Sequence, residues 1–226
     1  MTTGLKLEAI VLAAGLGRRF GGGKLTAELP GGRLIDRSLA CALAAPARSV
    51  WVVVGADPAV AKAAYAGGAK VVEAEDYAAG LSASLRAGIE ALPGDCDGAF
   101  IFLGDMPRVP QSILRLMAEA LDDGAFAVAP VFHGRRGHPV LFSNALFAEL
   151  LTLEGDKGAG ALLDGLGEGL VTIPAPDDGV LFDVDERIFM FYFAAATGVR
   201  LASIPRILAT SRSETAGAAL PQLLRT

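Results

Sequence analysis

Four short, continuous apolar segments alternate with helix-like segments along the first half of this 226-residue chain. An apolar run without polar alternation is typical of a strand buried on both faces of a parallel sheet. The intervening segments combine helical spacing with good helix formers. The predicted strands are residues 9–14, 49–55, 69–74 and 98–104, and the predicted helices between them are residues 34–45, 58–67 and 82–92. This succession indicates a parallel sheet with right-handed crossovers.

The second half continues with the same kinds of segment but with shorter strands. We expect helices over 111–123, 144–153 and 158–166, and strands over 125–132, 138–142 and 169–175. The predicted fold class is α/β, a Rossmann-like three-layer sandwich with a mostly parallel central sheet. Without a repeat or a low-complexity linker, we expect one domain over residues 1–226, with a core at about 7–200 and a disordered tail at about 211–226.

Composition excludes several classes of protein. Hydrophobic residues make up 52% of the chain, enough for a core without disulfides or metal staples. Cys41 and Cys96 lie in small or apolar surroundings, so we expect buried or free thiols in a reducing compartment rather than a disulfide or a metal site. A net charge of -5 gives no general attraction to nucleic acid, and no apolar segment is long enough for a signal peptide or a membrane span. We therefore expect a cytoplasmic protein.

A glycine-rich loop follows the first predicted strand, in "VLAAGLGRRFGGGK" from Val11 to Lys24. Ligands of open parallel sheets bind beyond the carboxyl ends of the strands, where this loop lies. Small residues let the backbone approach a phosphate, exposed N–H groups can form an anion-binding nest, and cations add charge-assisted contacts. The alternative is a mobile turn with solvated charges. The candidate anion-binding residues are Ala13, Ala14, Gly15, Gly17, Arg19 and Lys24.

Two familiar glycine motifs do not match this loop. The P-loop requires a glycine where the chain has Arg18 and a hydroxyl where it has Leu25. The dinucleotide fingerprint matches at Gly15 and Gly17 but has Phe20 at its third glycine. A dinucleotide-dependent oxidoreductase is therefore disfavoured.

Carboxylates follow two other segments. "FLGDMP" ends the fourth predicted strand with Asp105, at the same sheet edge as the glycine loop. Mg²⁺ takes one or two carboxylates plus substrate phosphates, so Asp105 is a candidate metal ligand, while a cap of the turn before Pro107 is the alternative. Asp183 and Asp185 lie two residues apart on a predicted strand and so on one face, although Asp185 could also be a helix N-cap.

The segment "LAAGLGRRFGGGKL" resembles the signature of the MobA-like nucleotidyltransferases, and it is most similar to their molybdenum cofactor cytidylyltransferase branch. The resemblance covers residues 10 to about 185 and implies the nucleotide-diphospho-sugar transferase fold. It implies that Arg19 and Lys24 hold the phosphates of a nucleoside triphosphate and share the catalytic role with Asp105. The family's G-D-x-P motif makes Asp105 a Mg²⁺ ligand, and of the later aspartates we expect Asp185 to be the second.

"YAAGLSASLRAGI" contributes to the nucleotide site in the same resemblance. It implies that Gly80 and Ser82 lie near the base and ribose, while local chemistry predicts Ser82 as a helix N-cap. The loop begins with Ala-Ala-Gly rather than Ala-Gly-Gly, which in this superfamily favours CTP over GTP.

"FHGRRGHPVLF" and "LEGDKGAGALL" are implied to face the acceptor substrate. Arg135 and His138 would hold the terminal phosphate of a pterin cofactor, and Asp156 is a weaker candidate. Taken alone, the first segment is equally compatible with a solvated basic hairpin and the second with a helix-start loop. The chain departs from the family after Asp185, where it reads "DERIFMFYFAAATG" instead of a Thr-Pro-Glu-Asp-like helix start.

These residues predict a Mg²⁺-dependent enzyme that moves CMP from CTP to the terminal phosphate of a molybdopterin-type cofactor and releases pyrophosphate. A phosphate monoester is mostly deprotonated near neutral pH, so no general base is required. The partners are CTP and that cofactor, together with a client molybdoenzyme, and include no nucleic acid or membrane. The alternatives are a transferase using GTP or another phosphate acceptor, and a non-catalytic module or chaperone that binds the pterin cofactor.

Overall fold

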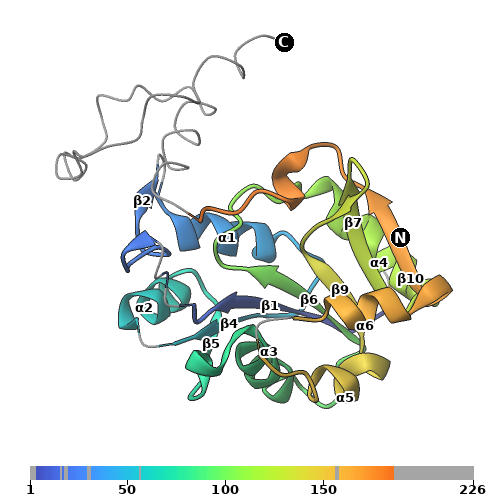
Figure 1. Ribbon diagram of the computed structural model, residues 1–226, viewed down its shortest axis with the longest axis horizontal. Helices are drawn as coiled ribbons and strands as arrows, with labels where there is room; N and C mark the ends of the chain where they lie inside the picture. Colours follow the sequence, from blue (N-terminus) through green and yellow to red (C-terminus); the bar gives the residue numbers. More distant parts are fainter. Residues whose placement is uncertain are drawn as a thin grey trace, which may run out of the picture.

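A computed structural model describes residues 4–185, except residues 16, 18, 19, 30, 31, 56, 156 and 157. Its main feature is an eight-stranded sheet with the strand order β10-β7-β9-β6-β1-β4-β5, in which β8 pairs with β7 (Figure 1). The strands are β1 (Leu7–Ala13), β4 (Val50–Val54), β5 (Lys70–Glu73), β6 (Gly98–Leu103), β7 (Ala127–Phe132), β8 (Arg135–Arg136), β9 (Val140–Ser143) and β10 (Leu170–Pro174).

Most strand pairs in the sheet are parallel. β1 pairs in parallel with β4 and β6, β4 pairs in parallel with β5, and β7 pairs in parallel with β10. β9 runs antiparallel between β6 and β7, and β8 forms an antiparallel hairpin with β7. The predicted α/β fold with a mostly parallel central sheet is confirmed.

Helices cover both faces of the sheet and complete the three predicted layers (Figure 1). One hydrophobic cluster joins the sheet to α1 (Leu34–Leu43), α2 (Pro58–Ala66) and α4 (Ser112–Asp122). A second cluster joins the opposite face to α3 (Leu81–Glu90), α5 (Phe147–Leu150) and α6 (Gly160–Gly165). The two clusters explain why the central strands are apolar without alternation.

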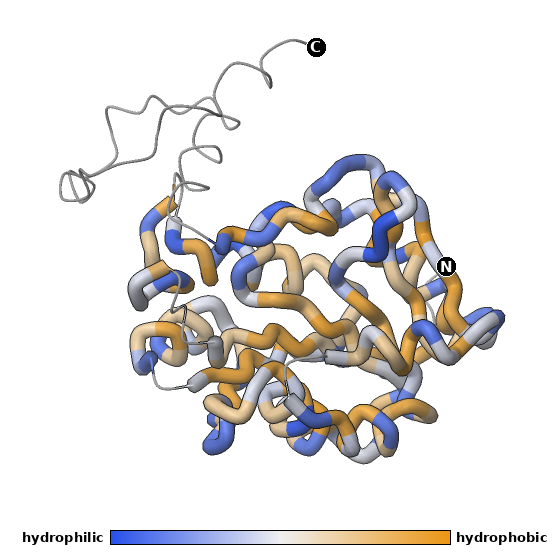
Figure 2. Tube along the Cα trace, in the orientation of Figure 1, coloured by the Kyte–Doolittle hydropathy of each residue, from blue (hydrophilic) through white to orange (hydrophobic). Residues whose placement is uncertain are grey.

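Strand β1 shows this arrangement residue by residue. Ala9 and Val11 belong to the first cluster, whereas Ile10 and Leu12 belong to the second. Every residue of β1 is buried, and in Figure 2 the central strands are coloured as hydrophobic. Because successive side chains of a strand point to opposite faces, this segment is apolar from Ala9 to Ala13. Its one charged residue, Glu8, is buried and accepts hydrogen bonds from Arg48 and Trp51.

Several local predictions were wrong at element boundaries. Residues 144–153 are not one helix: a 3₁₀ turn, Asn144–Leu146, precedes the single turn of α5. A short hairpin of β2 (Glu28–Leu29) and β3 (Gly32–Arg33) was not predicted. The chain at Asp183 and Asp185 is irregular rather than a strand.

The predicted cap at Ser82 was also wrong. Gly80 is the N-cap of α3, with φ of +116° and ψ of -178°. A residue with a side chain rarely adopts that conformation, so the glycine places the helix cap two residues earlier than predicted. Ser82 lies in the first turn of α3, and its backbone N–H donates to the carbonyl of Gly155.

Cys41 and Cys96 are both buried free thiols, as predicted. No helix among the described residues is long and apolar enough to cross a membrane. The prediction of one domain over residues 1–226 stays a prediction, because residues 186–226, including the predicted tail, lie outside the described part of the chain.

Candidate active site

The candidate site lies at the carboxyl edge of the central strands. β1 and β6 are neighbouring parallel strands, so the glycine loop after β1 and Asp105 after β6 leave the sheet side by side. The N–H of Gly104 donates to the carbonyl of Leu12 at 2.9 Å, which joins the two loops at their origin. The predicted meeting of the glycine loop with Asp105 is therefore observed.

Glycines give the loop a compact turn. Gly17 has φ of +54°, and its carbonyl accepts from the N–H groups of Phe20 and Gly22. A Cβ at Gly17 would lie 2.9 Å from the Cβ of Lys24, so the absence of a side chain lets the two segments pack together. Phe20, which breaks the dinucleotide fingerprint, is 6% exposed and belongs to the first hydrophobic cluster. Its ring anchors the loop to the core.

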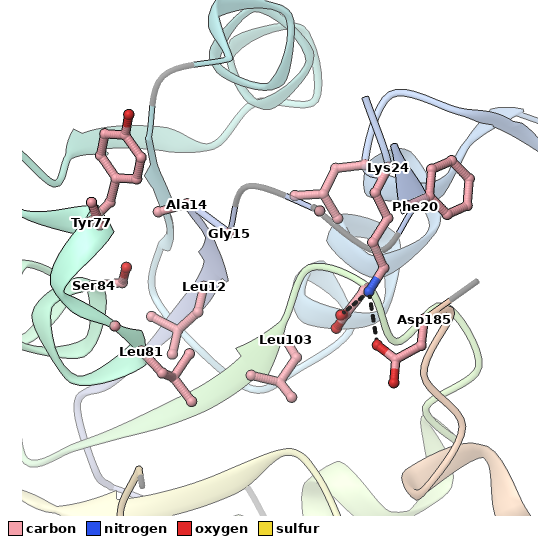
Figure 3. A pocket seen from close by; sticks show the side chains of 15 residues that line it. Leu12, Ala14, Gly15, Phe20, Lys24, Tyr77, Leu81, Ser84, Leu103 and Asp185 are labelled. Atoms are coloured by element: carbon pink, nitrogen blue, oxygen red, sulfur yellow. Dashed lines mark hydrogen bonds and ion pairs between the residues drawn. The ribbon is translucent and has the colours of Figure 1, made fainter. Parts of the chain in front are cut away.

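Lys24 joins the two predicted metal-ligating aspartates. Its Nζ lies 2.6 Å from Oδ2 of Asp105 and 3.3 Å from Oδ1 of Asp185 (Figure 3). The side chain of Lys24 is 11% exposed, against 26% for Asp105 and 47% for Asp185. Three residues far apart in sequence thus form one partly buried charged group.

Two glycines let the segment before Asp185 lie against this site. A Cβ at Gly137 would overlap the carbonyl of Val180, and a Cβ at Gly179 would overlap the carbonyl of Arg108. The N–H of His138 donates to the carbonyl of Val180 at 2.9 Å. These close backbone contacts hold residues 179–180 in place.

The same segment ends beside Asp105. The N–H of Val184 donates to the carbonyl of Asp105 at 3.1 Å, and Val184 is fully buried. Partial burial raises the pKa of Asp183, and the neighbouring carboxylates of Asp185 and Asp105 raise it further. The site therefore concentrates negative charge around one lysine.

The charged group stands at one end of a cleft of about 560 Å³, within the usual range for ligand sites. Figure 3 shows Ala14 and Gly15 between Lys24 and Tyr77. The cleft is lined by Leu12, Ala14, Gly15, Gly17, Phe20, Lys24, Leu25, Tyr77, Ala78, Gly80, Leu81, Ser84, Leu103, Asp105 and Asp185.

A second cavity of about 260 Å³ adjoins the cleft and shares Leu12, Leu81 and Leu103 with it. Its walls are mostly apolar, and its polar side chains are those of Arg136 and His138. Burial lowers the pKa of His138, which therefore favours a neutral imidazole near pH 7. Two adjoining cavities of different character suit two substrates that bind side by side.

The cleft brings together seven of the predicted site residues: Ala14, Gly15, Gly17, Lys24, Gly80, Asp105 and Asp185. Ala13 lines a smaller adjoining cavity beside the glycine loop. Ser82 is 1% exposed and does not line the cleft, whereas Ser84 does. Arg19 and Asp156 lie outside the described residues.

The structure places the acceptor candidates around the second cavity without testing their role. His138 lines that cavity, and of the two exposed arginines of β8, Arg136 lines it and Arg135 does not. Arg136 donates to Asp164 at 2.8 Å. Adjacent residues of a strand point to opposite faces, so alternation in the β7–β8 hairpin could have identified Arg136 once the hairpin was known.

Tyr77 is a cleft residue that sequence reasoning missed. It stands in the 3₁₀ turn Tyr77–Ala79 that precedes Gly80. A lone tyrosine before a Gly-Leu-Ser turn carries no motif, so no sequence signal marked it.

The residues fit a divalent metal ion that is held by two carboxylates and by phosphate oxygens of a bound substrate. No group of three or more His, Cys, Asp and Glu side chains within the described segments is arranged to hold a metal. Asp105 and Asp185 nevertheless approach the same ammonium, so their carboxylates face a common point. Two carboxylates plus phosphate oxygens is a usual donor set for Mg²⁺.

Comparison with known proteins identifies the family. The MobA-like NTP transferase domain matches residues 9–170. The chain belongs to this family. The predicted nucleotidyltransferase class is thereby confirmed, and the MobA-like fold accounts for the cleft at the carboxyl edge of the sheet.

Two curated relatives extend the comparison. Molybdenum cofactor cytidylyltransferase of Escherichia coli (strain K12) is 31% identical over 139 residues, which span 61% of this chain and 70% of that protein. Purine catabolism protein PucB of Bacillus subtilis (strain 168) is 33% identical over 190 residues, which span 79% of this chain and 91% of that protein.

Solved structures agree with the family assignment. Rv0371c from Mycobacterium tuberculosis H37Rv is 26% identical, with a TM-score of 0.71 over 85% of this chain and 98% of its own. A manganese complex of the same protein has a TM-score of 0.62 over 75% of this chain and 88% of its own, also at 26% identity.

Proposed function

We propose that this MobA-like transferase moves CMP from CTP to the terminal phosphate of a molybdopterin-type cofactor and releases pyrophosphate. The observation that carries the proposal is the approach of Lys24, Asp105 and Asp185 at one end of the cleft. That group suits a metal-bound triphosphate, and the glycine loop lies directly beside it. The Escherichia coli relative, named as a molybdenum cofactor cytidylyltransferase, supports CTP and the pterin acceptor.

In the proposed reaction, an oxygen of the acceptor phosphate attacks the α-phosphorus of CTP. A new P–O bond forms there, the bond from the α-phosphorus to the oxygen bridging to the β-phosphate breaks, and pyrophosphate leaves with its electron pair. The acceptor phosphate is already largely ionised near neutral pH, so the site needs no general base. Catalysis is then positioning and charge neutralisation.

Different residues of the chain would bind the phosphates and the metal ion. Lys24 offers its ammonium to the triphosphate, and the backbone N–H groups of Ala14, Gly15 and Gly17 can cradle phosphate oxygens. Asp105 and Asp185 would hold a divalent cation, Mg²⁺ in our proposal, which supplies charge neutralisation for the phosphates. Arg19, outside the described residues, is proposed as a further phosphate-binding cation. The manganese complex of Rv0371c supports use of a divalent metal.

The acceptor is proposed to enter through the second cavity. It adjoins the cleft through Leu12, Leu81 and Leu103, so an acceptor there would approach the nucleotide from beside β6. Arg136 would supply the positive charge, and a neutral His138 would supply a hydrogen bond rather than charge. Arg135 and Asp156 are retained as peripheral acceptor contacts.

One observation favours a particular class of client enzyme for the same activity. The Bacillus subtilis relative covers more of this chain than the Escherichia coli one and is named for purine catabolism. The same transfer chemistry could therefore serve a client enzyme of purine catabolism.

The test is product formation. We would incubate the protein with Mg²⁺, CTP and molybdopterin and measure the mass of the pterin product by mass spectrometry. The proposal predicts a product heavier by one cytidylyl group, and it predicts loss of that product in Asp105→Asn. An unmodified pterin with folded wild-type protein, or full conversion by Asp105→Asn, would overturn it.

A further inference from the structure

The two ends of the cleft differ in chemistry. Among its described lining residues, the charges belong to Lys24, Asp105 and Asp185, all at one end. The other end is formed by Tyr77, with Ala78, Gly80, Leu81 and Ser84 nearby in the chain. Figure 3 shows Tyr77 across Ala14 and Gly15 from Lys24 and Asp185. A ligand that spans the cleft therefore needs an anionic end and an uncharged end.

Tyr77 is held in place by its surroundings. Its ring packs against Gly55, where an added Cβ would lie 3.0 Å from Cγ and 3.1 Å from Cδ2 of the ring. The N–H of Tyr77 donates to the carbonyl of Ala74 at 3.3 Å, and its carbonyl accepts from Gly80 at 3.4 Å. The residue is half-buried and packs against the second hydrophobic cluster. A ring backed by a glycine and still lining a cleft offers a rigid aromatic wall.

We propose that the Tyr77 ring is the surface on which the nucleobase stacks, so that Tyr77 positions the nucleotide and carries the part of its affinity that the triphosphate does not. The inference rests on the proposed function and adds to it the residue that receives the base. Aromatic side chains bind bases through their π-faces without reading a base edge. Tyr77 therefore raises affinity for any nucleoside triphosphate, and the choice of base falls to other groups at the same end.

Two other places for the base fit less well. Phe20, the second aromatic lining residue, is 6% exposed and labelled beside Lys24 in Figure 3, at the charged end. The second cavity carries Arg136 and His138, which suit an acceptor phosphate better than a base. A base there would also leave the uncharged end of the cleft without a ligand.

The experiment compares two ligands on matched variants by isothermal titration calorimetry with Mg²⁺ present. CTP carries the base, whereas inorganic tripolyphosphate carries the anionic part alone. Tyr77→Ala removes the ring and Tyr77→Phe keeps it without the hydroxyl. Tyr65→Ala is the control, because Tyr65 is a 66% exposed tyrosine on α2 that does not line the cleft. Thermal melting checks that each variant is folded.

The proposal predicts that Tyr77→Ala weakens CTP binding by about 5-fold to 150-fold, the range of base–aromatic stacking, and leaves tripolyphosphate binding within about twofold. Tyr77→Phe and Tyr65→Ala should both keep CTP affinity. Equal loss for the two ligands would show that Tyr77 only shapes the loop and would overturn the inference, as would unchanged CTP binding.

The test also separates this inference from the proposed function. If Tyr77→Ala keeps its affinity for CTP while wild-type protein still forms the cytidylyl product, the stacking assignment is wrong and the activity stands. If the wild type binds neither ligand, the proposed function is wrong and the inference falls with it.

Discussion

Replacing Lys24 by methionine should have opposite effects on metal binding and nucleotide binding. The change keeps an unbranched side chain and removes the ammonium that lies 2.6 Å from Asp105 and 3.3 Å from Asp185. A divalent cation that takes the two carboxylates competes with this ammonium. Without nucleotide, Lys24→Met should therefore bind a metal ion more tightly than the wild type.

The magnitude follows from the exposure of each partner. A hydrogen bond to a charged group contributes about 1.5–3 kcal/mol, which applies to the contact with partly buried Asp105. Asp185 is 47% exposed, so its contact contributes at most about 1 kcal/mol. Because about 1.4 kcal/mol is tenfold in affinity, we expect at least about tenfold tighter Mn²⁺ binding in Lys24→Met. CTP binding should weaken by a similar factor, since the triphosphate loses one charge-assisted contact.

The assay is Mn²⁺ binding by electron paramagnetic resonance of the free ion, with and without CTP. Lys70→Met is the matched control, because Lys70 is the first residue of β5, at the amino end of that strand, whereas the site lies at the carboxyl ends of the parallel strands, and the substitution removes the same charge. Lys70→Met should bind Mn²⁺ like the wild type. If Lys24→Met binds Mn²⁺ no more tightly than Lys70→Met does, Lys24 does not compete for the carboxylates and their assignment as metal ligands is refuted.

Three further predictions follow from other contacts. Gly137→Ala, whose Cβ would overlap the carbonyl of Val180, should cost about 1–3 kcal/mol of unfolding free energy and weaken Mn²⁺ binding; unchanged urea denaturation would contradict this. Arg136→Gln should raise the KM for the acceptor about tenfold or more, whereas exposed Arg135→Gln should raise it less than threefold; steady-state kinetics that reverse this order would place the acceptor elsewhere. Burial raises the pKa of Cys96 to about 11, above the ordinary value of about 8.5. As pH rises, the unfolded chain therefore loses this thiol proton before the folded protein does. The free energy of unfolding should fall between those pH values, by up to about 1.4 kcal/mol per pH unit. Chemical denaturation at pH 8 to 10.5 measures how the free energy of unfolding changes with pH, and Cys96→Ala should make that decrease smaller. An identical pH dependence in both proteins would show that Cys96 does not cause the decrease.

The central sheet could be predicted from the sequence because each of its strands is marked by its own run of apolar residues. A strand buried on both faces is apolar at successive positions, and Ile10 and Val11 fall in opposite clusters as that pattern requires. The place of the glycine loop and of Asp105 follows from the same pattern, since both come directly after such strands. This part of the site needed no knowledge of tertiary contacts beyond the parallel arrangement.

Other features depend on contacts between distant residues. Asp185 reaches Lys24 because Gly137 and Gly179 let an irregular segment pack closely against its neighbours, and no local spacing encodes that approach. The resemblance to a family, rather than the residues themselves, pointed to Asp185.

Other features that local sequence did not specify have similar causes. Gly80, with φ of +116°, sets the start of α3 and removes Ser82 from the cap position. The register of β8 on β7 decides that Arg136 rather than Arg135 lines the second cavity. Tyr77 enters the cleft through a 3₁₀ turn that packs its ring on Gly55. Each outcome depends on backbone geometry that composition and periodicity do not specify.

Pyrophosphate release, measured with Mg²⁺ and each of CTP, GTP, ATP and UTP, with and without a molybdopterin acceptor, tests the proposed activity most directly. We expect release that requires the acceptor and is fastest with CTP. Acceptor-dependent release that is fastest with GTP would contradict the assigned base, and the absence of release with every nucleotide from folded protein would contradict the assigned chemistry.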